Sequence, residues 1–376
     1  MKDIFISSDN ILSPLGSTTA ENFSQLSRLN TAVKKHEESV MSEKNFYASL
    51  FEKDASFIDD KNSYTKFEQL LIASLKDALN QSKVSPTDKR TILIISTTKG
   101  NISLLENGAN DISVKEKISL HHSAKLVAGH FGFSNKPVVV SNACISGLLA
   151  MITGMRLIRA GLYDHAVVAG ADVITKFILS GFQSFQAVSS GPCKPFDRSR
   201  DGINLGEGAA TVVLSSDKSV SNGMRILGGS VSNDANHISG PSRTGEELHQ
   251  AIQNALKESG ISPQDINLIS AHGTATVYND EMEAKAISLA GLQNVPLNSL
   301  KGYYGHTLGA AGLIETIISM HSLKQNLVIP TLGFKEMGVS LPLNIPSQLQ
   351  KAELKNCLKT ASGFGGCNAA LIISKD

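Results

Sequence analysis

Hydrophobic and polar positions follow two different periods along the chain, and these periods predict strands and helices in turn. Runs of β-branched residues typical of short buried strands occupy residues 91–97, 137–143, 165–173 and 210–216. Apolar residues recur at helical spacing over residues 63–84, 123–133 and 145–159. Strands that alternate with helices predict an α/β fold with a parallel-rich sheet and crossover helices.

The second half of the sequence repeats this order of elements. After residue 224 the pattern predicts a strand at "RILGGSV", a helix at "GEELHQAIQNALKESG", strands at "INLISAHG" and "VPLNSL", and a helix at "GAAGLIETIISMHSLKQ". We therefore expect two copies of one α/β unit, residues 1–220 and 221–376. The charged stretch from Lys34 to Asn62 is expected to be a surface excursion, and its role cannot be read from the sequence.

Composition narrows the class of protein. The chain has 376 residues, 41% hydrophobic, with a formal net charge of +1, so a large core is expected and no basic surface indicates a nucleic acid partner. Its four cysteines show neither zinc spacing nor a disulfide framework, which fits reduced thiols in the cytoplasm. Because no apolar run approaches the ~18 residues of a membrane span, we expect a soluble cytoplasmic protein without a signal peptide.

Cys144 is the first candidate for chemistry. It stands in "PVVVSNACISGLLA", between a predicted strand and the start of a predicted helix. The free N–H groups and dipole of a helix N-terminus favour an anion, so we expect the thiol pKa to be lowered. The local sequence leaves the alternative open that this cysteine only packs in the core.

Two histidines strengthen the catalytic interpretation. His272 in "LISAHGTAT" and His306 in "NSLKGYYGHTLGAAG" each follow a predicted strand, as Cys144 does. Open α/β sheets build their sites at such strand ends, although either histidine alone could be a core residue. The glycine-rich "SGFGGCN" near the C-terminus allows a close backbone approach and an N–H directed at an oxyanion, but an ordinary turn would look the same.

Several ordered motifs resemble those of the β-ketoacyl-ACP synthases with a Cys-His-His site, in the thiolase superfamily. The resemblance spans nearly the whole chain and rests on "SPLGSTTAENFSQL", "NACISG", "CKPFDRSRDGINLGEGAA", "AHGTATVYND", "KGYYGHTLGAAGLIE" and "GFGGCN". It implies a thiolase-like α/β fold, two duplicated halves in a five-layered αβαβα arrangement. It also implies an acyltransferase that condenses an acyl chain with malonyl-ACP in fatty acid, polyketide or polyene-type biosynthesis.

The resemblance assigns a role to each reactive group. Cys144 would hold the acyl chain as a thioester, and His272 and His306 would donate hydrogen bonds to the malonyl thioester oxygen as it becomes an enolate. The backbone N–H groups of Cys144 and Phe364 would hold the oxyanion of the second step. Lys301 and Glu315 would form a charged pair that supports the histidines, with a solvated salt bridge as the alternative.

Further positions are expected to contact the substrate. Thr274 and Thr276 match hydroxyls that bind the phosphopantetheine arm in the family, although both could be ordinary turn residues. The loop "SNDANHISGP" resembles a family loop beside the active site that moves with the glycine-rich turn, so Asp234 and His237 would take part in gating while Phe364 swings. Asp197, Arg200 and Asp201 are expected to be scaffolding.

Partners and alternatives follow from the same resemblance. We expect acyl carrier protein as partner, a homodimer or a heterodimer with a homologous subunit, and neither a bound cofactor nor a metal. A chain-length-factor-like subunit is the first alternative, although such subunits typically lack the cysteine. A thiolase that uses Cys357 or Cys367 as a second catalytic thiol is the other. The chain is shorter than usual around residues 101–122, and it differs near the site, at Asn279, Tyr303, Tyr304, Ser362, Ile203 and Asn204.

Overall fold

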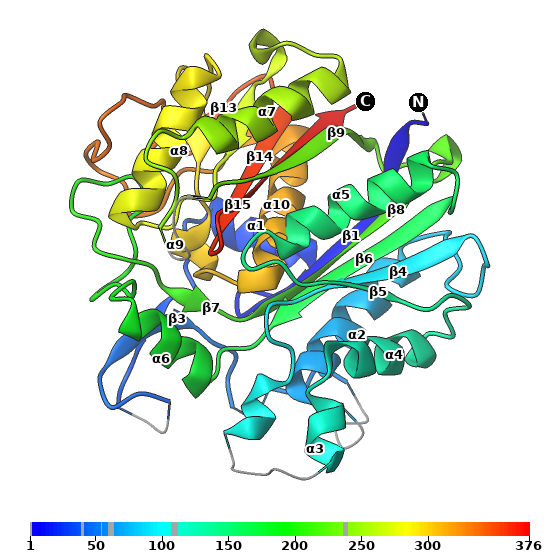
Figure 1. Ribbon diagram of the computed structural model, residues 1–376. Helices are drawn as coiled ribbons and strands as arrows, with labels where there is room; N and C mark the ends of the chain where they lie inside the picture. Colours follow the sequence, from blue (N-terminus) through cyan, green and yellow to red (C-terminus); the bar gives the residue numbers. More distant parts are fainter. Residues whose placement is uncertain (1, 39–40, 54, 59–63, 107–111, 236–239) are drawn as a thin grey trace.

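A computed structural model describes residues 2–38, 41–53, 55–58, 64–106, 112–235 and 240–376 (Figure 1). Within these residues, ten strands form one sheet in the order β11-β10-β14-β15-β9-β1-β8-β6-β4-β5. The first half of the chain contributes β1 (Ile4–Leu12), β4 (Thr91–Ser96), β5 (Val138–Val140), β6 (His165–Asp172) and β8 (Gly208–Ser215). The second half contributes β9 (Met224–Asn233), β10 (Leu268–Ser270), β11 (Leu297–Asn298), β14 (Asn356–Gly363) and β15 (Cys367–Lys375).

The two halves of the sheet repeat one topology. The order β5-β4-β6-β8-β1 in one half corresponds strand by strand to β11-β10-β14-β15-β9 in the other. In both, the outer two ladders are parallel and the inner two antiparallel. The predicted duplicated α/β fold is therefore confirmed. A division into two domains at residue 220 stays a prediction, because β1 and β9 pair at Ile4↔Ile226, Phe5↔Arg225 and Ile6↔Met224 and join the halves.

Helices complete five layers. Helix α2 (Lys66–Asn80) and α4 (Leu120–His130) cover the outer face of the first half-sheet, and α7 (Glu246–Ser259) and α8 (Val277–Leu289) cover that of the second. Helices α5 (Ser146–Arg159) and α10 (Ala311–Gln325) lie in the middle and contact strands of both halves. Each central helix follows the edge strand of its own half, β5 or β11.

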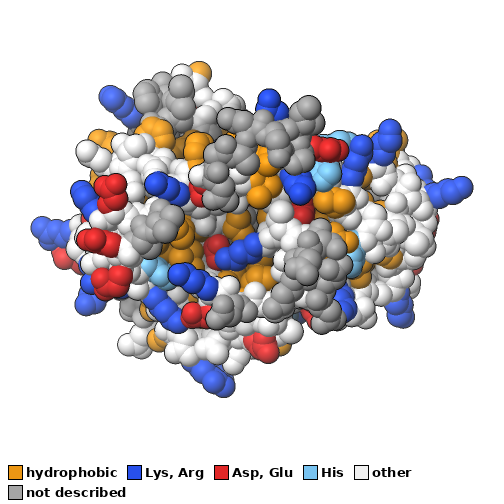
Figure 2. Space-filling model, turned by 90° about the horizontal axis from the view of Figure 1, so that it is seen from below, with side chains coloured by type: hydrophobic (Ala, Val, Ile, Leu, Met, Phe, Trp, Pro, Cys, Tyr) orange, Lys and Arg blue, Asp and Glu red, His pale blue; other side chains and the backbone are white. Residues whose placement is uncertain are grey.

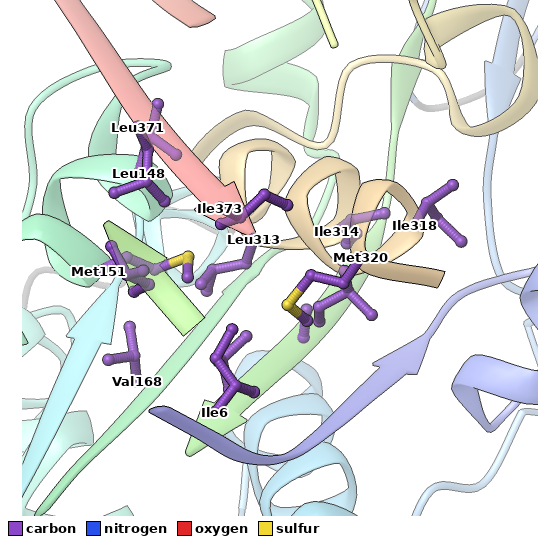
Figure 3. Packing of buried hydrophobic residues seen from close by; sticks show 14 of the residues in the cluster. Ile6, Leu148, Met151, Val168, Leu313, Ile314, Ile318, Met320, Leu371 and Ile373 are labelled. Carbon is purple, nitrogen blue, oxygen red and sulfur yellow. The ribbon is translucent and has the colours of Figure 1, made fainter. Parts of the chain in front are cut away.

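The central layer is the core of the molecule. Apolar side chains from the two central helices and from strands of both halves pack there (Figure 3), among them Leu148, Met151, Leu313, Ile314, Ile318, Ile6, Val168 and Leu371. The helices approach closely at glycines. A Cβ on Gly147 would lie 2.8 Å from the carbonyl oxygen of Gly309, and one on Gly312 would lie 2.6 Å from the backbone nitrogen of Leu148. Only glycine permits this approach.

The structure differs from the sequence-based prediction in several elements. The sheet is mixed rather than parallel-rich, and β5 covers only three residues of the predicted 137–143. Strand β1 was not predicted, because its buried middle is polar: Ser7, Ser8, Asp9 and Asn10 interrupt the hydrophobic pattern. Ser8 shows how such residues are accommodated, since its hydroxyl donates to the carbonyl of Ala78 at 2.7 Å.

Smaller elements surround this framework. Part of the expected surface excursion forms a three-stranded sheet with buried Phe46 and Ala48, made by β2 (Lys34–His36), β3 (Phe46–Ser49) and β7 (Leu205–Gly206). The remaining elements are α1 (Thr19–Ser27), η1 (Ile102–Leu105), α3 (Ile112–Lys117), α6 (Lys176–Ser184), η2 (Lys218–Val220), η3 (Pro263–Asp265), α9 (Lys301–Tyr304), η4 (Leu308–Ala310), β12 (Leu327–Val328) and β13 (Gln350–Lys351). Across the described ranges, we find no helix with both the length and the apolar character needed to cross a membrane.

Candidate active site

Cys144, His272 and His306 meet at one end of the central layer. One ligand-capable atom from each side chain, the Cys144 Sγ and a ring nitrogen of each histidine, lies within 4.8 Å of the other two. All three residues are buried, yet they line a cavity of about 460 Å³ together with side chains from α6 and the start of α8. The structure thus brings together the three residues that the sequence singled out.

A tight turn presents Cys144. The residue lies between β5 and α5, and the preceding Ala143 has φ of 45°, in the left-handed region that non-glycine residues rarely adopt. The Ser146 hydroxyl stabilises this turn, since it donates to the Ala143 carbonyl at 2.6 Å and accepts from the Asn142 N–H at 2.8 Å. Backbone strain that is held by such bonds is typical of functional turns.

The predicted lowering of the Cys144 pKa is wrong. Burial raises the pKa of this thiol to about 12, and the neighbouring Cys367 adds to the rise, although Lys301 and the backbone N–H of Phe364 act in the opposite direction. Loss of water around a thiolate outweighs the favourable helix N-terminus. Cys144 therefore rests as a neutral thiol at pH 7.

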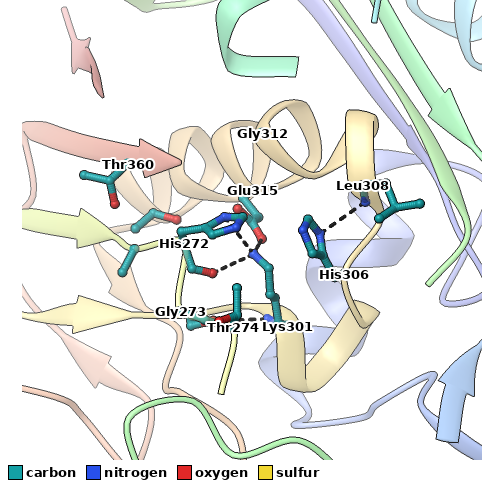
Figure 4. Close-up of polar contacts among 12 residues, drawn as sticks. His272, Gly273, Thr274, Lys301, His306, Leu308, Gly312, Glu315 and Thr360 are labelled. Carbon is teal, nitrogen blue, oxygen red and sulfur yellow. Dashed lines mark hydrogen bonds and ion pairs between the residues drawn. The ribbon is translucent and has the colours of Figure 1, made fainter. Parts of the chain in front are cut away.

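Two carboxylates of α8 hold the backbone at His272. The N–H groups of His272 and Gly273 donate to the two oxygens of Glu283, at 2.8 and 2.6 Å, and the N–H of Thr274 donates to Asp280 at 2.9 Å. On the imidazole, Nδ1 lies 3.3 Å from Nζ of Lys301 (Figure 4). Because an ammonium only donates, Nδ1 accepts and the proton of the neutral ring lies on Nε2.

His306 is placed differently from the prediction. It does not end β11, because the helical turn α9 (Lys301–Tyr304) lies between that strand and the histidine. Its Nδ1 accepts the N–H of Leu308 at 3.2 Å (Figure 4), so its ring proton also lies on Nε2. Within the described part of the chain, this Nε2 has no hydrogen-bond partner. A buried donor without a partner is a candidate contact for substrate.

Both imidazoles are neutral donors. Burial, reinforced by Lys301 and Lys359, lowers the pKa of His272 and of His306 well below the usual value. Three such side chains could also hold a metal ion. Metal binding at Nε2 would require moving each ring proton to Nδ1, where it would oppose the Lys301 ammonium or the Leu308 N–H. The tautomers instead favour two N–H donors directed at a substrate oxygen.

A buried charged network lies behind His272. Lys301 Nζ contacts Glu315 Oε1 at 2.7 Å and donates to the His272 carbonyl at 2.6 Å, so the predicted Lys301–Glu315 pair is present (Figure 4). A second ammonium was missed by the sequence analysis: Nζ of Lys359, on β14, lies 2.7 Å from Glu315 Oε2. The apolar strand pattern around Lys359 contained the only signal, a lysine in the middle of a buried strand.

The glycine-rich turn between β14 and β15 closes another side of the cavity. Gly365 and Gly366 have φ of 88° and 76°. In this turn the backbone N–H of Phe364 is directed towards the Cys144 thiol. The Phe364 ring is 36% exposed and packs between two aromatic rings of the α6 region, with centroids 5.6 Å from Phe182 and 5.4 Å from Phe185. This turn carries both a backbone donor and an aromatic wall.

Three of the four predicted substrate-contact residues line the cavity. The hydroxyls of Thr274 and Thr276 lie 2.8 Å apart at its rim. Asp234 donates its N–H to the Gly366 carbonyl at 2.8 Å and accepts the N–H of Ser242, which ties its loop to the glycine-rich turn. His237 lies outside the described residues.

The unusual residues divide into two groups. Asn279, Ser362 and Ile203 line the cavity, whereas Tyr303 and Tyr304 are buried away from it. Asn204 is also buried, and its carbonyl accepts the N–H of His306 at 2.7 Å. Three residues were expected to be scaffolding: Asp197, Arg200 and Asp201. They form hydrogen bonds chiefly with backbone groups and with neighbouring hydroxyls.

Neither candidate for a second catalytic thiol lines the cavity. Cys357 is fully buried in β14. The Cys367 thiol contacts the carbonyls of Asn142 and Phe364, at 3.8 and 3.5 Å, directly after the glycine-rich turn. Among the residues that the structure describes, one cysteine therefore lines the cavity opposite two N–H donors, an arrangement suited to acyl transfer through a thiol on a duplicated α/β fold.

The chain belongs to the β-ketoacyl synthase family. The family model "Beta-ketoacyl synthase, N-terminal domain" matches residues 10–219, and the model of the C-terminal domain matches residues 224–335. The family that the sequence resembled is thus confirmed, and with it the class of condensing, acyl-transferring enzymes.

Relatives and solved structures agree with this assignment. The chain is 27% identical to a putative mitochondrial 3-oxoacyl-[acyl-carrier-protein] synthase of Schizosaccharomyces pombe, over 82% of this chain and 81% of that protein. It is 35% identical to 3-oxoacyl-[acyl-carrier-protein] synthase 2 of Rhizobium meliloti, but over only 63% of this chain and 60% of that protein. A β-ketoacyl synthase from Burkholderia phymatum superimposes with a TM-score of 0.90 at 25% identity, covering 100% of both chains.

A further structural match comes from a two-protein complex. A chain in the complex of the ketosynthase ApeO with its chain length factor ApeC, from Xenorhabdus doucetiae, superimposes with a TM-score of 0.87 at 26% identity. The alignment covers 100% of this chain and 98% of that one. The fold therefore occurs in a complex of a ketosynthase with its chain length factor.

Proposed function

We propose that this protein is a β-ketoacyl-acyl-carrier-protein synthase that joins an acyl chain on Cys144 to malonyl-ACP. The single observation that carries the proposal is the geometry of the site: one buried thiol faces two imidazoles, both locked with Nε2–H as a donor. Such a pair suits an enolate oxygen better than it suits a metal or a general base. No bound cofactor is needed, because both substrates arrive on carrier phosphopantetheine.

The first step transfers the acyl chain. The Cys144 sulfur attacks the thioester carbonyl of acyl-ACP, a C–S bond to Cys144 forms, the bond to the carrier breaks, and the thiol proton passes to the departing carrier thiolate. The backbone N–H groups of Cys144 and Phe364, which hold the oxyanion of the condensation step, also stabilise the oxyanion of this first step. The Phe364 N–H is already directed at the thiol. A thiol with a raised pKa needs this coupled proton transfer.

The second step forms the carbon–carbon bond. Malonyl-ACP loses carbon dioxide while its thioester oxygen, held by Nε2–H of His272 and His306, becomes an enolate. The enolate carbon attacks the acyl carbonyl on Cys144, the Cys144 thiolate leaves, and it takes up one proton from solvent. Thr274 and Thr276 bind the phosphopantetheine arm, since their paired hydroxyls lie at the cavity rim. Asp234 couples its loop to the turn of Phe364.

The partners are acyl carrier protein and a second synthase-like subunit, in the cytoplasm. Hydrophobic side chains lie in a hollow on the face that carries α3 and α6, with both basic and acidic side chains beside it (Figure 2), and a hydrophobic hollow suits an acyl chain. The match to a chain in a ketosynthase–chain length factor complex supports a heterodimer, and a homodimer is the alternative. A purely pocket-shaping subunit is less consistent with an intact cysteine and two histidines.

One experiment tests the reaction and the subunit composition together. The purified protein is incubated with acyl-ACP and malonyl-ACP, and mass spectrometry of the peptide containing Cys144 is combined with measurement of released carbon dioxide. An acyl group on Cys144 and carbon dioxide release are expected. Absence of both, with the protein alone and with a homologous subunit present, would contradict the proposal, whereas activity only with that subunit establishes the heterodimer.

A further inference from the structure

Lys359 is a fully buried lysine that the reaction described above does not use. It lies on β14 and is 0% exposed. Its ammonium touches Glu315 Oε2 at 2.7 Å and donates to the carbonyls of Ser270 and Ala271, at 3.0 and 3.2 Å. A buried charge is retained only when partners compensate for lost hydration, and Lys359 has three.

The two lysines act on one short segment. Lys359 donates to the carbonyls of Ser270 and Ala271, and Lys301 donates to the next carbonyl, that of His272, at 2.6 Å. Both ammonium groups also contact Glu315, one on each carboxylate oxygen. Three successive carbonyls at the end of β10 are therefore fixed by one lysine–glutamate–lysine bridge. This bridge fixes the backbone from which the His272 side chain extends.

The bridge also leaves one positive charge in excess beneath the imidazoles. It combines two ammonium groups with one carboxylate, since both lysines hold the pKa of buried Glu315 below its usual value although burial alone would raise it. Burial lowers the pKa of Lys359, while Glu315 and, less strongly, Glu283 raise it. The oxygens of Glu283 accept the N–H groups of His272 and Gly273, and Asp280 accepts the N–H of Thr274.

We propose that Lys359 is a positioning residue for condensation, which fixes the His272 backbone and supplies the excess positive charge that favours a negative enolate oxygen at the imidazoles. The inference rests on the proposed function, because the enolate is its intermediate. A fixed positive charge in a site without water stabilises developing negative charge strongly and needs no reorganisation. In the same way it disfavours protonation of either imidazole, which keeps both as neutral N–H donors.

The test removes the charge and then restores the balance. Lys359→Met leaves one ammonium facing one carboxylate, so carbon dioxide release from malonyl-ACP is expected to slow about 10- to 100-fold while acylation of Cys144 changes less than about threefold. Combining Lys359→Met with Glu315→Gln returns the excess of one positive charge. The double variant should therefore recover part of the decarboxylation rate that the single variant loses.

A direct readout separates charge from packing. NMR titration of the histidine ring nitrogens should show higher pKa values for His272 and His306 in Lys359→Met, and values closer to wild type in the double variant. Lys359→Gln, which keeps a donor for the two carbonyls, takes the place of the methionine variant if that one does not fold. As a matched control, Lys66→Met removes an ammonium from the ion pair with Glu207, outside the cavity, and should leave the rate within about twofold.

The outcomes are distinguishable. Unchanged histidine titration and unchanged decarboxylation in a folded Lys359→Met variant would overturn the proposal. So would a double variant slower than the single one, because Lys359 would then act through packing alone. If the wild-type protein itself neither acylates Cys144 nor releases carbon dioxide, the proposed function fails, while the histidine titration still decides whether Lys359 sets the charge of the site.

Discussion

Cys144 and His306 occupy matching places in the two halves of the molecule, each between an edge strand and the central helix that follows it. The neighbouring strand ends differ. In the first half, Asp172 at the end of β6 accepts hydrogen bonds from Thr97, from Thr98 and from the Gly309 N–H of the other half. In the second half, the matching ends carry His272 and the turn of Phe364. In the proposed reaction, one half therefore supplies the nucleophile and a fixed support, and the other supplies the donors.

The largest effect is expected at the nucleophile. Cys144→Ala removes the only thiol that lines the described cavity, so no acyl chain should become attached and condensation should fall at least about 1,000-fold. Intact-mass measurement after incubation with acyl-ACP checks this. Cys367→Ala is the control that should still accept the chain, and normal condensation by Cys144→Ala would refute the assignment of roles to the halves.

Loss of a donor in the second half should separate the two steps. His272→Ala and His306→Ala each remove one Nε2–H, and removal of one oxyanion donor costs about 2.7–4 kcal/mol, or about 100- to 1,000-fold in rate. Decarboxylation should fall by that factor while acylation of Cys144 persists. Rapid single-turnover assays of carbon dioxide release and of thioester formation measure the two steps. Decarboxylation at the wild-type rate in both variants would disprove the enolate role.

The support in the first half should matter for both stability and rate. Asp172→Ala leaves the N–H groups of Thr98 and Gly309 unpaired in a buried place, which we expect to lower the free energy of unfolding by about 2–4 kcal/mol. Because Gly309 follows His306 by three residues, decarboxylation should also fall, by about 10-fold. Thermal unfolding and the decarboxylation assay test this, and an unchanged melting temperature would show that the contact between halves is unimportant.

A smaller effect is expected at the end of β14, the counterpart of Asp172. A Cβ on Gly363 would lie 2.9 Å from the Cys367 sulfur and 3.0 Å from the Cys144 backbone nitrogen. Gly363→Ala should therefore displace the N–H groups of Cys144 and Phe364 and slow acylation severalfold, with a loss of about 1–3 kcal/mol in stability. Gly129→Ala is the control, since Gly129, like Gly363, has no positive φ and no atom lies within 4 Å of its Cβ position.

The smallest change is expected from pH. Since the pKa values of His272 and His306 lie well below the usual one, both rings stay neutral as the pH falls from 8 to 6. A base with a lowered pKa takes up its proton only at lower pH, so the decarboxylation rate should vary less than about twofold over this range. A rate profile with a midpoint near 6.5 would indicate histidines that are exposed to water.

Hydrophobic patterning predicted most of the framework and failed where buried positions are polar. The strand at β4 and the helix at α5 were predicted to within about a residue, because their patterns follow their burial. Strand β1 was missed because its buried serines, aspartate and asparagine look like a loop. The mixed sheet was missed too, since pairing direction depends on connections that periodicity does not describe.

For the site, the sequence motifs located the three reactive side chains but not their environment. Burial around Cys144 raises its pKa, and this burial arises from elements far apart in the chain. The same holds for Lys359 and Glu283, whose partners lie on other strands and helices. A lysine in a strand normally indicates a solvent-facing side, so its charge network could not be predicted from local pattern.

The close glycine contacts between α5 and α10 bear on how substrate preference could diversify. With Gly147 against Gly309 and Gly312 against Leu148, the helices that follow Cys144 and His306 are locked together, and their separation does not depend on the surrounding loops. Mutations in α6, or at Thr274 and Thr276 on the cavity rim, can therefore change the shape of the cavity without changing the positions of Cys144 and His306. Selection for a new acyl chain could proceed in many small steps, each of which keeps the chemistry intact.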